Sequence, residues 1–96
     1  MNKSRFVFSA TSVADLQRIN GFYSSINHKV LKLAFDRLME AFDVIDQFPN
    51  IGRILVQKSG TREFVVPFGE GNFFIRYRTM KSKIHVAHIW HSLEDE

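Results

Sequence analysis

Apolar side chains in the first half of the chain recur at steps of three and four residues, the spacing of one face of an α-helix. A first stripe consists of Val13, Leu16, Ile19, Tyr23 and Ile26. A second stripe consists of Leu31, Ala34, Phe35, Leu38, Phe42 and Ile45. Before them, residues 5–9 form a short run rich in aromatic and β-branched side chains, which is typical of a strand. The pattern predicts a strand followed by two amphipathic helices.

Polar residues at the ends of these stripes indicate where each helix begins and ends. Ser12 and Asp15 have the spacing of a capping box, in which each side chain accepts a hydrogen bond from the backbone N–H of the other. Asn27 is expected to cap the second helix, and Pro49 to end it. Because the link between the helices is short, we expect them to pack as an antiparallel hairpin.

In the second half the apolar pattern changes to alternation, which is typical of strands with one buried face. We expect strands at residues 61–68, 72–79 and 83–91, turns at 69–72 and 80–83, and a loop at 49–60. In the middle strand, one side carries Phe73, Ile75 and Tyr77, and the other carries Phe74, Arg76 and Arg78. The expected fold class is α+β, in the order β-α-α-β-β-β, with the helical hairpin packed on one face of an antiparallel sheet.

The interior is expected to combine the inward-facing side chains of both halves, with residues 1–96 forming one domain. The predicted core consists of Leu16, Ile19, Phe35, Leu38, Phe42, Ile75, Val86 and Trp90. Truncating one of these to alanine should cost roughly 2–5 kcal/mol.

Composition excludes several classes of protein. Hydrophobic residues make up 45% of the 96, and no stretch approaches the ~20 apolar residues of a membrane span. The N-terminal apolar run is too short for a signal peptide. Cysteine is absent, so disulfides and thiolate metal sites are excluded. We expect a cytoplasmic protein that has no membrane association.

The charge is unevenly distributed along the chain. Residues 48–92 carry seven basic and two acidic side chains, whereas the last residues include Glu94, Asp95 and Glu96. A basic second half suits an anionic partner such as nucleic acid or an acidic peptide, although a solvated surface explains the same count.

Three histidines lie close together in the sequence near the C-terminus. In a strand, His85 and His91 share one face but lie about 20 Å apart, and His88 points to the other face. Three such side chains do not converge on one ion, so a metal site is disfavoured and no cofactor is expected. His88 is expected to be half-buried with a hydrogen-bond partner, on the same face as Ile84, Val86 and Trp90. His85 is expected to be exposed.

Five segments follow one another in a characteristic order. They are ATSVADLQRINGFYSSIN at 10–27, FPNIGR at 48–53, GTREFVV at 60–66, FIRYR at 74–78 and IHVAHIWH at 84–91. In this order and spacing they resemble the ParE/RelE superfamily, the toxins of bacterial type II toxin–antitoxin systems. The resemblance implies the β-α-α-β-β-β fold and a cognate antitoxin with which the toxin forms a hetero-oligomer.

The superfamily is divided by target. RelE-like members cut mRNA on the ribosome with basic side chains, histidine or tyrosine, which activate the 2′-OH and stabilise charge. ParE-like members poison DNA gyrase and are not hydrolases. Here Phe73 stands where the ribonuclease branch typically has arginine, and an acidic tail replaces that branch's terminal tyrosine or Lys-Arg. Acidic groups beside a phosphate-cleaving site would repel its substrate. We therefore predict a gyrase poison, with a RelE-like mRNA endonuclease as the alternative.

The resemblance also indicates candidate site residues. The expected target- or partner-binding residues are Arg62, Phe74, Arg76, Arg78 and His91. On the ribonuclease alternative, the catalytic residues would be Arg62, Arg76, Arg78 and His91. His91 stands where ParE-like strands commonly end in histidine and where some ribonuclease members have a catalytic one. Arg62 could equally be structural. ParE relatives often have arginine after that histidine, where this chain has SLEDE.

Two further interpretations stay open. A nucleic-acid-binding module would use Phe73, Phe74, Arg76, Tyr77 and Arg78 for stacking and phosphate contacts, although Phe73 and Tyr77 belong to the apolar side of their strand. A non-toxic interaction protein is also compatible with the sequence. In the toxin interpretation, we expect the antitoxin on the open sheet face, with acidic residues against the basic half and an apolar anchor over Phe74.

Overall fold

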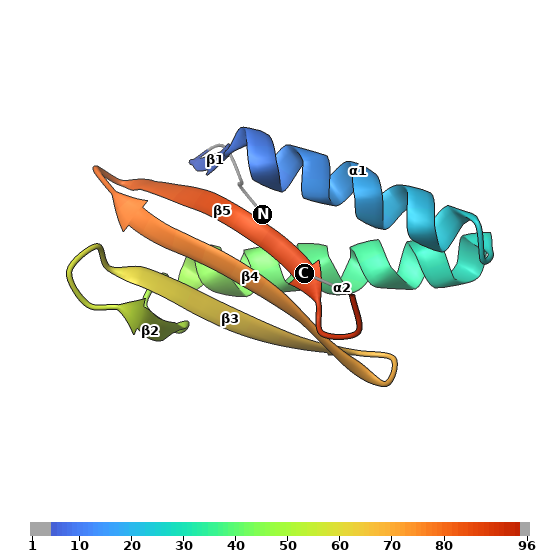
Figure 1. The fold of residues 1–96 in the computed structure, drawn as a ribbon. Coiled ribbons are helices and arrows are strands. Elements are labelled where there is room, and N and C mark those ends of the chain that lie inside the picture. The colour runs from blue at the N-terminus through green and yellow to red at the C-terminus, as the bar shows by residue number, and fades with distance from the viewer. Residues whose placement is uncertain (1–4, 95–96) are drawn as a thin grey trace.

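The computed structural model describes residues 5–94 as a helical hairpin packed on one face of a sheet (Figure 1). The elements are β1 (Phe6–Phe8), α1 (Ala10–Ser24), α2 (His28–Gln47), β2 (Arg53–Val56), β3 (Thr61–Phe68), β4 (Gly71–Met80) and β5 (Lys83–His91). The strand order is β1-β5-β4-β3-β2. Strand β1 is parallel to β5, and the other neighbours are antiparallel. The predicted fold class is confirmed. Neither described helix has the length and hydropathy needed to cross a membrane.

The segment expected to be a loop contains an additional strand, β2. It pairs antiparallel with β3, so that Arg53 lies opposite Glu63 and Ile54 opposite Arg62. Its side chains are mostly exposed at the edge of the sheet. Such a short strand has no alternating buried face, so its pattern carries no strand signal, and its pairing depends on β3.

The N-cap of the first helix lies three residues before the predicted one. Ser9 is the N-cap, and its side chain accepts a hydrogen bond from the Ser12 N–H at 3.0 Å. The predicted capping box of Ser12 and Asp15 is therefore wrong, and the Asp15 side chain is used elsewhere. The second cap is confirmed, because Asn27 accepts from the Val30 N–H at 2.9 Å.

The core lies between the helical hairpin and the inner face of the sheet. Of the predicted core, Ile19, Leu38, Phe42, Ile75 and Val86 are buried, whereas Leu16 and Phe35 are partly buried and pack against them. Phe73 and Tyr77 are fully buried, as their alternation predicted. Trp90 is not in the core, and this prediction is wrong. It lies on the opposite face of the sheet, stacked on Phe74.

A β-bulge in β5 accounts for the position of Trp90. Arg76 pairs with His88 and Tyr77 pairs with Val86, so Ala87 is an extra residue in the ladder. One extra residue reverses the faces of all side chains beyond it. Ile84 and Val86 therefore face inward before the bulge, whereas Ile89 and His91 face inward after it.

The bulge also changes the positions of the histidines. His88 shares a face with Trp90 as expected, but not with Ile84 and Val86. The prediction that His85 and His91 share a face is wrong, since His91 is buried and His85 pairs with Arg78 on the other side.

Candidate functional site

The predicted site residues lie on both sides of the sheet. Phe74, Arg76 and Arg78 are on the side away from the helices, here called the outer face. Arg62 lies opposite the inward-facing Tyr77 and is therefore on the helix side of the sheet, not with Arg76 and Arg78. His91 is 6% exposed and also lies on the helix side, where its ring contacts Phe73. The sheet therefore separates Arg76 and Arg78 from the other two polar residues.

The outer face consists of three rows of side chains that run across the strands. The rows, in order along the sheet, are Val65–Phe74–Trp90, Arg53–Glu63–Arg76–His88 and Arg78–His85. An aromatic row is thus followed by two rows that contain basic side chains. Trp90 and His88 were not among the predicted site residues, because their position depends on the bulge.

The aromatic side chains of the outer face form a stack. The Phe74 and Trp90 rings have centroids 5.2 Å apart and are inclined by 23°. The His88 and Trp90 rings have centroids 4.6 Å apart and are inclined by 22°. The Arg76 guanidinium carbon lies 4.7 Å from the centroid of the Trp90 ring, within the range of a cation–π contact.

A nearly buried glutamate lies among the arginines of this face. The Glu63 side chain is 6% exposed, with Arg53 Nη2 at 3.1 Å and Arg76 Nη2 at 3.4 Å from its two oxygens. Burial of a carboxylate is tolerable when it is paired in this way. The Arg76 Nε is buried and has no hydrogen-bond partner among residues 5–94. The Arg76 side chain is therefore held by Trp90 and Glu63 but has unused hydrogen-bonding capacity.

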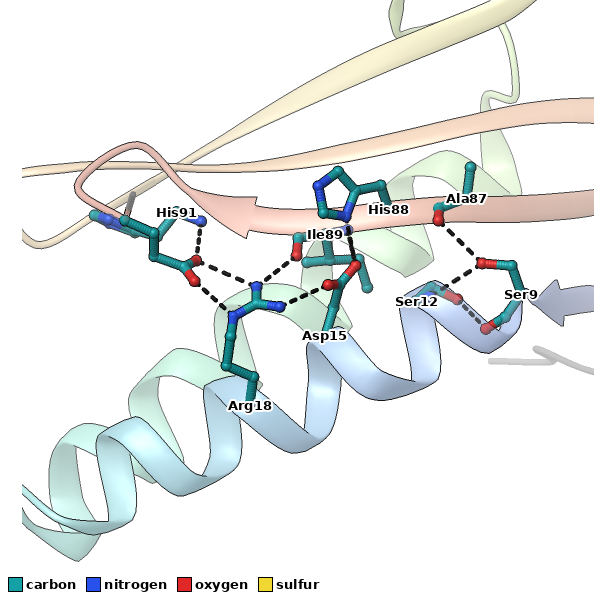
Figure 2. A network of polar contacts seen from close by, with 9 residues as sticks. Ser9, Ser12, Asp15, Arg18, Ala87, His88, Ile89 and His91 are labelled. Atoms are coloured by element: carbon teal, nitrogen blue, oxygen red, sulfur yellow. Dashed lines mark hydrogen bonds and ion pairs between the residues drawn. The ribbon is translucent and has the colours of Figure 1, made fainter. Parts of the chain in front are cut away.

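Strand β1 pairs with only the first part of the β5 edge. Side chains of Ser9 and of α1 form hydrogen bonds with the backbone of the remaining part (Figure 2). The Ser9 hydroxyl donates to the Ala87 carbonyl at 3.0 Å. Asp15 Oδ2 accepts from the Ile89 N–H at 2.8 Å, and Arg18 Nη2 donates to the Ile89 carbonyl at 3.1 Å. An unprotected edge strand invites pairing with another chain. Here the helix occupies that edge instead.

Asp15 is the centre of this network. Its carboxylate accepts from Arg18 Nη1 and His88 Nδ1, each at 2.6 Å, in addition to the Ile89 N–H. Burial alone would raise the pKa of Asp15, but hydrogen bonds from Arg18, Ile89 and His88 outweigh it and hold the pKa below its ordinary value. The expected hydrogen bond of His88 is confirmed, and its partner is Asp15.

The C-terminal segment is attached to the same network. Arg18 Nε donates to Glu94 Oε1 at 2.6 Å, and Glu94 Oε2 accepts from the His91 N–H at 2.6 Å. The first acid of the tail therefore lies beside α1 on the helix side. Asp95 and Glu96 lie outside the described residues.

Both ring nitrogens of His91 have hydrogen-bond partners. Its Nδ1 accepts from the Leu93 N–H at 3.2 Å, which assigns the ring proton of the neutral form to Nε2. Nε2 then donates to the Phe68 carbonyl at 2.8 Å. The ring joins the end of β3 to the C-terminal segment, which is a structural arrangement.

Arg62 is engaged in a second structural cluster at the end of α2. Its Nη1 donates to the carbonyls of Asn50 at 3.0 Å and Gly52 at 2.8 Å. The Tyr77 hydroxyl donates to the Pro49 carbonyl at 2.8 Å and accepts from the Gly52 N–H at 3.0 Å. Burial raises the pKa of Tyr77. The FPNIGR motif is therefore bound to β3 and β4 through backbone groups.

An apolar groove lies at the end of the helical hairpin, on the helix side. Its volume is about 710 Å³. Its lining consists of Arg18, Ile19, Phe22, Tyr23, Val30, Leu33, Phe68, Gly69, Glu70, His91, Leu93 and Glu94. Phe22, Leu33 and Leu93 are 60%, 49% and 69% exposed, an unusual exposure for three large apolar side chains in one place. Its members come from four separate segments, so no local sequence pattern indicates it.

Within residues 5–94, no three histidine, aspartate or glutamate side chains are grouped closely enough to hold a metal ion. The arrangement instead offers two surfaces, the apolar groove and the cationic, aromatic outer face. Each is suited to binding a macromolecule.

Comparison with known proteins identifies the family. The profile of the family described as "ParE toxin of type II toxin-antitoxin system, parDE" matches residues 6–96. The chain is also similar to "Toxin RelE1" of Caulobacter vibrioides, with 42% identity over 57 residues. That alignment covers 59% of this chain and 59% of the relative, so the chain spans less than two thirds of the relative's length. The chain belongs to the ParE toxin family of type II toxin–antitoxin systems, within the ParE/RelE superfamily.

Proposed function

We propose that this chain is a ParE-like toxin that binds DNA gyrase, blocks DNA replication and is neutralised by a cognate antitoxin. It would act in the cytoplasm and, as such toxins do, contribute to plasmid stabilisation. The observation that supports this over phosphate cleavage is the separation of the candidate catalytic residues by the sheet. Arg76 and Arg78 lie on the outer face, whereas Arg62 and His91 lie on the helix side.

Ribonuclease chemistry needs basic groups and a proton acceptor around one phosphate. Both His91 ring nitrogens are occupied by backbone partners, and Arg62 is bound to two loop carbonyls. Phe73, in the position of a ribonuclease arginine, is fully buried. Glu94 adds a carboxylate next to His91. These features favour a toxin that acts by binding.

The antitoxin is proposed to occupy the apolar groove. An antitoxin segment that folds on binding must bury apolar side chains against its partner. The exposed Phe22, Leu33 and Leu93 offer an apolar surface for this. Among the charged residues of the lining, Arg18 and Glu94 are paired with each other, and the exposed Glu70 can pair with a basic side chain on a bound amphipathic helix. An antitoxin segment over Phe74 on the open face remains the alternative prediction.

Pulse labelling after induction tests the proposed target. The chain is expressed alone in bacteria, and incorporation of labelled thymidine and methionine is followed over the first minutes. DNA synthesis should stop first, and purified chain should increase the DNA cleaved by purified gyrase. Arrest of protein synthesis first, without gyrase-dependent cleavage, would exclude the gyrase proposal.

A RelE-like ribonuclease is the second candidate, and two observations favour it. One is the name of the relative. The other is His88, which lies next to Arg76 on the outer face. Its Nδ1 is 2.6 Å from Oδ2 of Asp15, a residue of α1. A carboxylate that orients a histidine is a common arrangement for proton transfer. If protein synthesis stops first and His88→Gln removes the effect while the chain stays folded, His88 is the base and this candidate is correct.

A further inference from the structure

We propose that the outer face binds single-stranded DNA directly, with bases stacking against the aromatic row and phosphates contacting Arg76 and Arg78. The choice of DNA rather than RNA rests on the proposed function, in which the toxin acts on gyrase and the DNA that gyrase cleaves. The binding of single-stranded DNA needs no gyrase and can be measured with the isolated chain.

The aromatic side chains of the outer face are already arranged for stacking. Phe74, Trp90 and His88 form a run of near-parallel rings, inclined by 23° and 22° at centroid spacings of 5.2 and 4.6 Å. Each nucleobase is a flat ring of similar size, so a base can extend such a run as one more plane. Stacking on aromatic side chains is the sequence-tolerant part of single-strand recognition.

The neighbouring rows supply cations at the sites where a backbone would follow the bases. Arg53 is 72% exposed in its side chain, Arg76 is 39% exposed, and Arg78 is exposed next to them. The acid that the described strands place on this face is Glu63, and its buried carboxylate is already paired with Arg53 and Arg76. The exposed part of the Arg76 side chain is available for a charge-assisted contact with a phosphate.

The same features fit a protein partner less well. A protein anchor requires an apolar pocket into which a side chain is inserted. The groove with this character lies on the other side of the sheet. On the outer face the aromatic rings pack against one another and against a guanidinium. A ligand there meets flat ring surface and positive charge and not an apolar pocket. Flat anionic ligands match that combination.

Tryptophan fluorescence reports on this face, because Trp90 is the single tryptophan of the chain. We would titrate the purified chain with oligothymidylate about 12 nucleotides long, within the range of ~4–16 nucleotides that single-strand-binding folds cover. Saturable quenching is expected. The logarithm of the association constant should fall with the logarithm of the salt concentration with a slope of about −2 if three arginines contact phosphates.

Matched charge reversals localise the binding. Arg78→Glu should weaken binding about tenfold or more, because a phosphate contact becomes a repulsion. Lys29→Glu makes the same change of charge at an exposed position of α2, away from this face. It should change the affinity less than about twofold. Phe74→Ala should weaken binding about tenfold through lost stacking, measured by anisotropy of a labelled oligonucleotide.

Several outcomes would overturn the inference. They are absence of quenching, equal effects of the two charge reversals, or quenching by an acidic peptide but not by oligothymidylate. A clear preference for an RNA oligonucleotide of the same length over oligothymidylate would contradict the choice of DNA. This test is separate from that of the proposed function. If the chain does not bind oligothymidylate but its induction still stops DNA synthesis, this inference alone is overturned. Binding by a chain that leaves DNA synthesis running would instead support this inference and contradict gyrase poisoning.

Discussion

Asp15 joins three parts of the molecule through one carboxylate. It accepts hydrogen bonds from Arg18 of its own helix and from the backbone and side chain of β5. Arg18 in turn holds Glu94 of the C-terminal segment. The side chain of Asp15 is 5% exposed. A nearly buried carboxylate with several donors is stable only while it is ionised and paired.

The pH dependence of stability follows from this environment. The pKa of Asp15 is lower in the folded chain than its ordinary value, so the unfolded chain takes up a proton first as the pH falls. The stabilisation is complete well above an unfolded value of about 3.9 and is lost as the pH falls through the folded pKa. Asp15→Asn should therefore reduce the free energy of unfolding at neutral pH by about 2–3 kcal/mol. The deficit should shrink in acid.

Urea denaturation at neutral and acidic pH measures the deficit. Asp36→Asn is the control, since Asp36 forms an exposed pair with Lys32 and should contribute within about 0.5 kcal/mol. A deficit of the same size at both pH values would show that the charge of Asp15 is not the source.

The faces of individual strand residues could be predicted from the sequence only where the strand pairing is regular. Phe73 and Tyr77 face inward as their alternation predicted, because no irregularity interrupts the pairing of β3 with β4. Trp90 does not, because the bulge at Ala87 reverses its face. Alternation in the sequence assumes a regular ladder, and a single extra residue breaks that assumption.

At the scale of elements, the turn between β4 and β5 has an uncommon conformation. Lys81 and Ser82 have φ angles of 51° and 67°. Positive φ at both central residues is the geometry of a type I′ hairpin turn, whose twist matches that of the strands. Side chains with a Cβ adopt this conformation at a cost, whereas glycine does so freely.

Ser82→Gly should therefore stabilise the protein, by about 0.5–1 kcal/mol. Thermal unfolding should shift upward by a few degrees, since 1 kcal/mol corresponds to about 4–8 °C for a domain of this size. At Ala14, an exposed position in the interior of helix α1, substitution by glycine should instead lower the melting temperature because glycine disfavours helix. Shifts of the same sign in both variants would contradict the turn assignment.

At the scale of the whole molecule, the sheet separates two surfaces. The apolar groove is bounded by the ends of the helices and the C-terminal segment, and the outer face lies on the other side of the strands. A ligand in one does not cover the other directly. The network from Arg18 through Asp15 to His88 nevertheless runs from the groove to the aromatic stack.

Two substitutions on α2 test whether the groove holds the antitoxin. Leu33→Asp introduces a charge into the groove and should weaken binding of the cognate antitoxin about tenfold or more, while the chain still arrests growth. Met39→Asp places the same charge at an exposed position of α2 outside the groove lining and should leave binding unchanged. Calorimetry with the antitoxin measures both. Equal affinity of the two variants would place the antitoxin elsewhere.

Local periodicity in the sequence was sufficient for both helices, for strands β3, β4 and β5, and for most of the core, because a buried stripe or face is a property of consecutive residues. The aromatic and β-branched composition of residues 5–9 was sufficient for strand β1. The tertiary structure alone decided the pairing of β2, the bulge at Ala87, the use of Asp15 and the separation of Arg76 and Arg78 from Arg62 and His91. These features depend on hydrogen bonds between residues far apart in the chain, such as Asp15 and Ile89. No local pattern of hydrophobic and polar positions encodes such contacts.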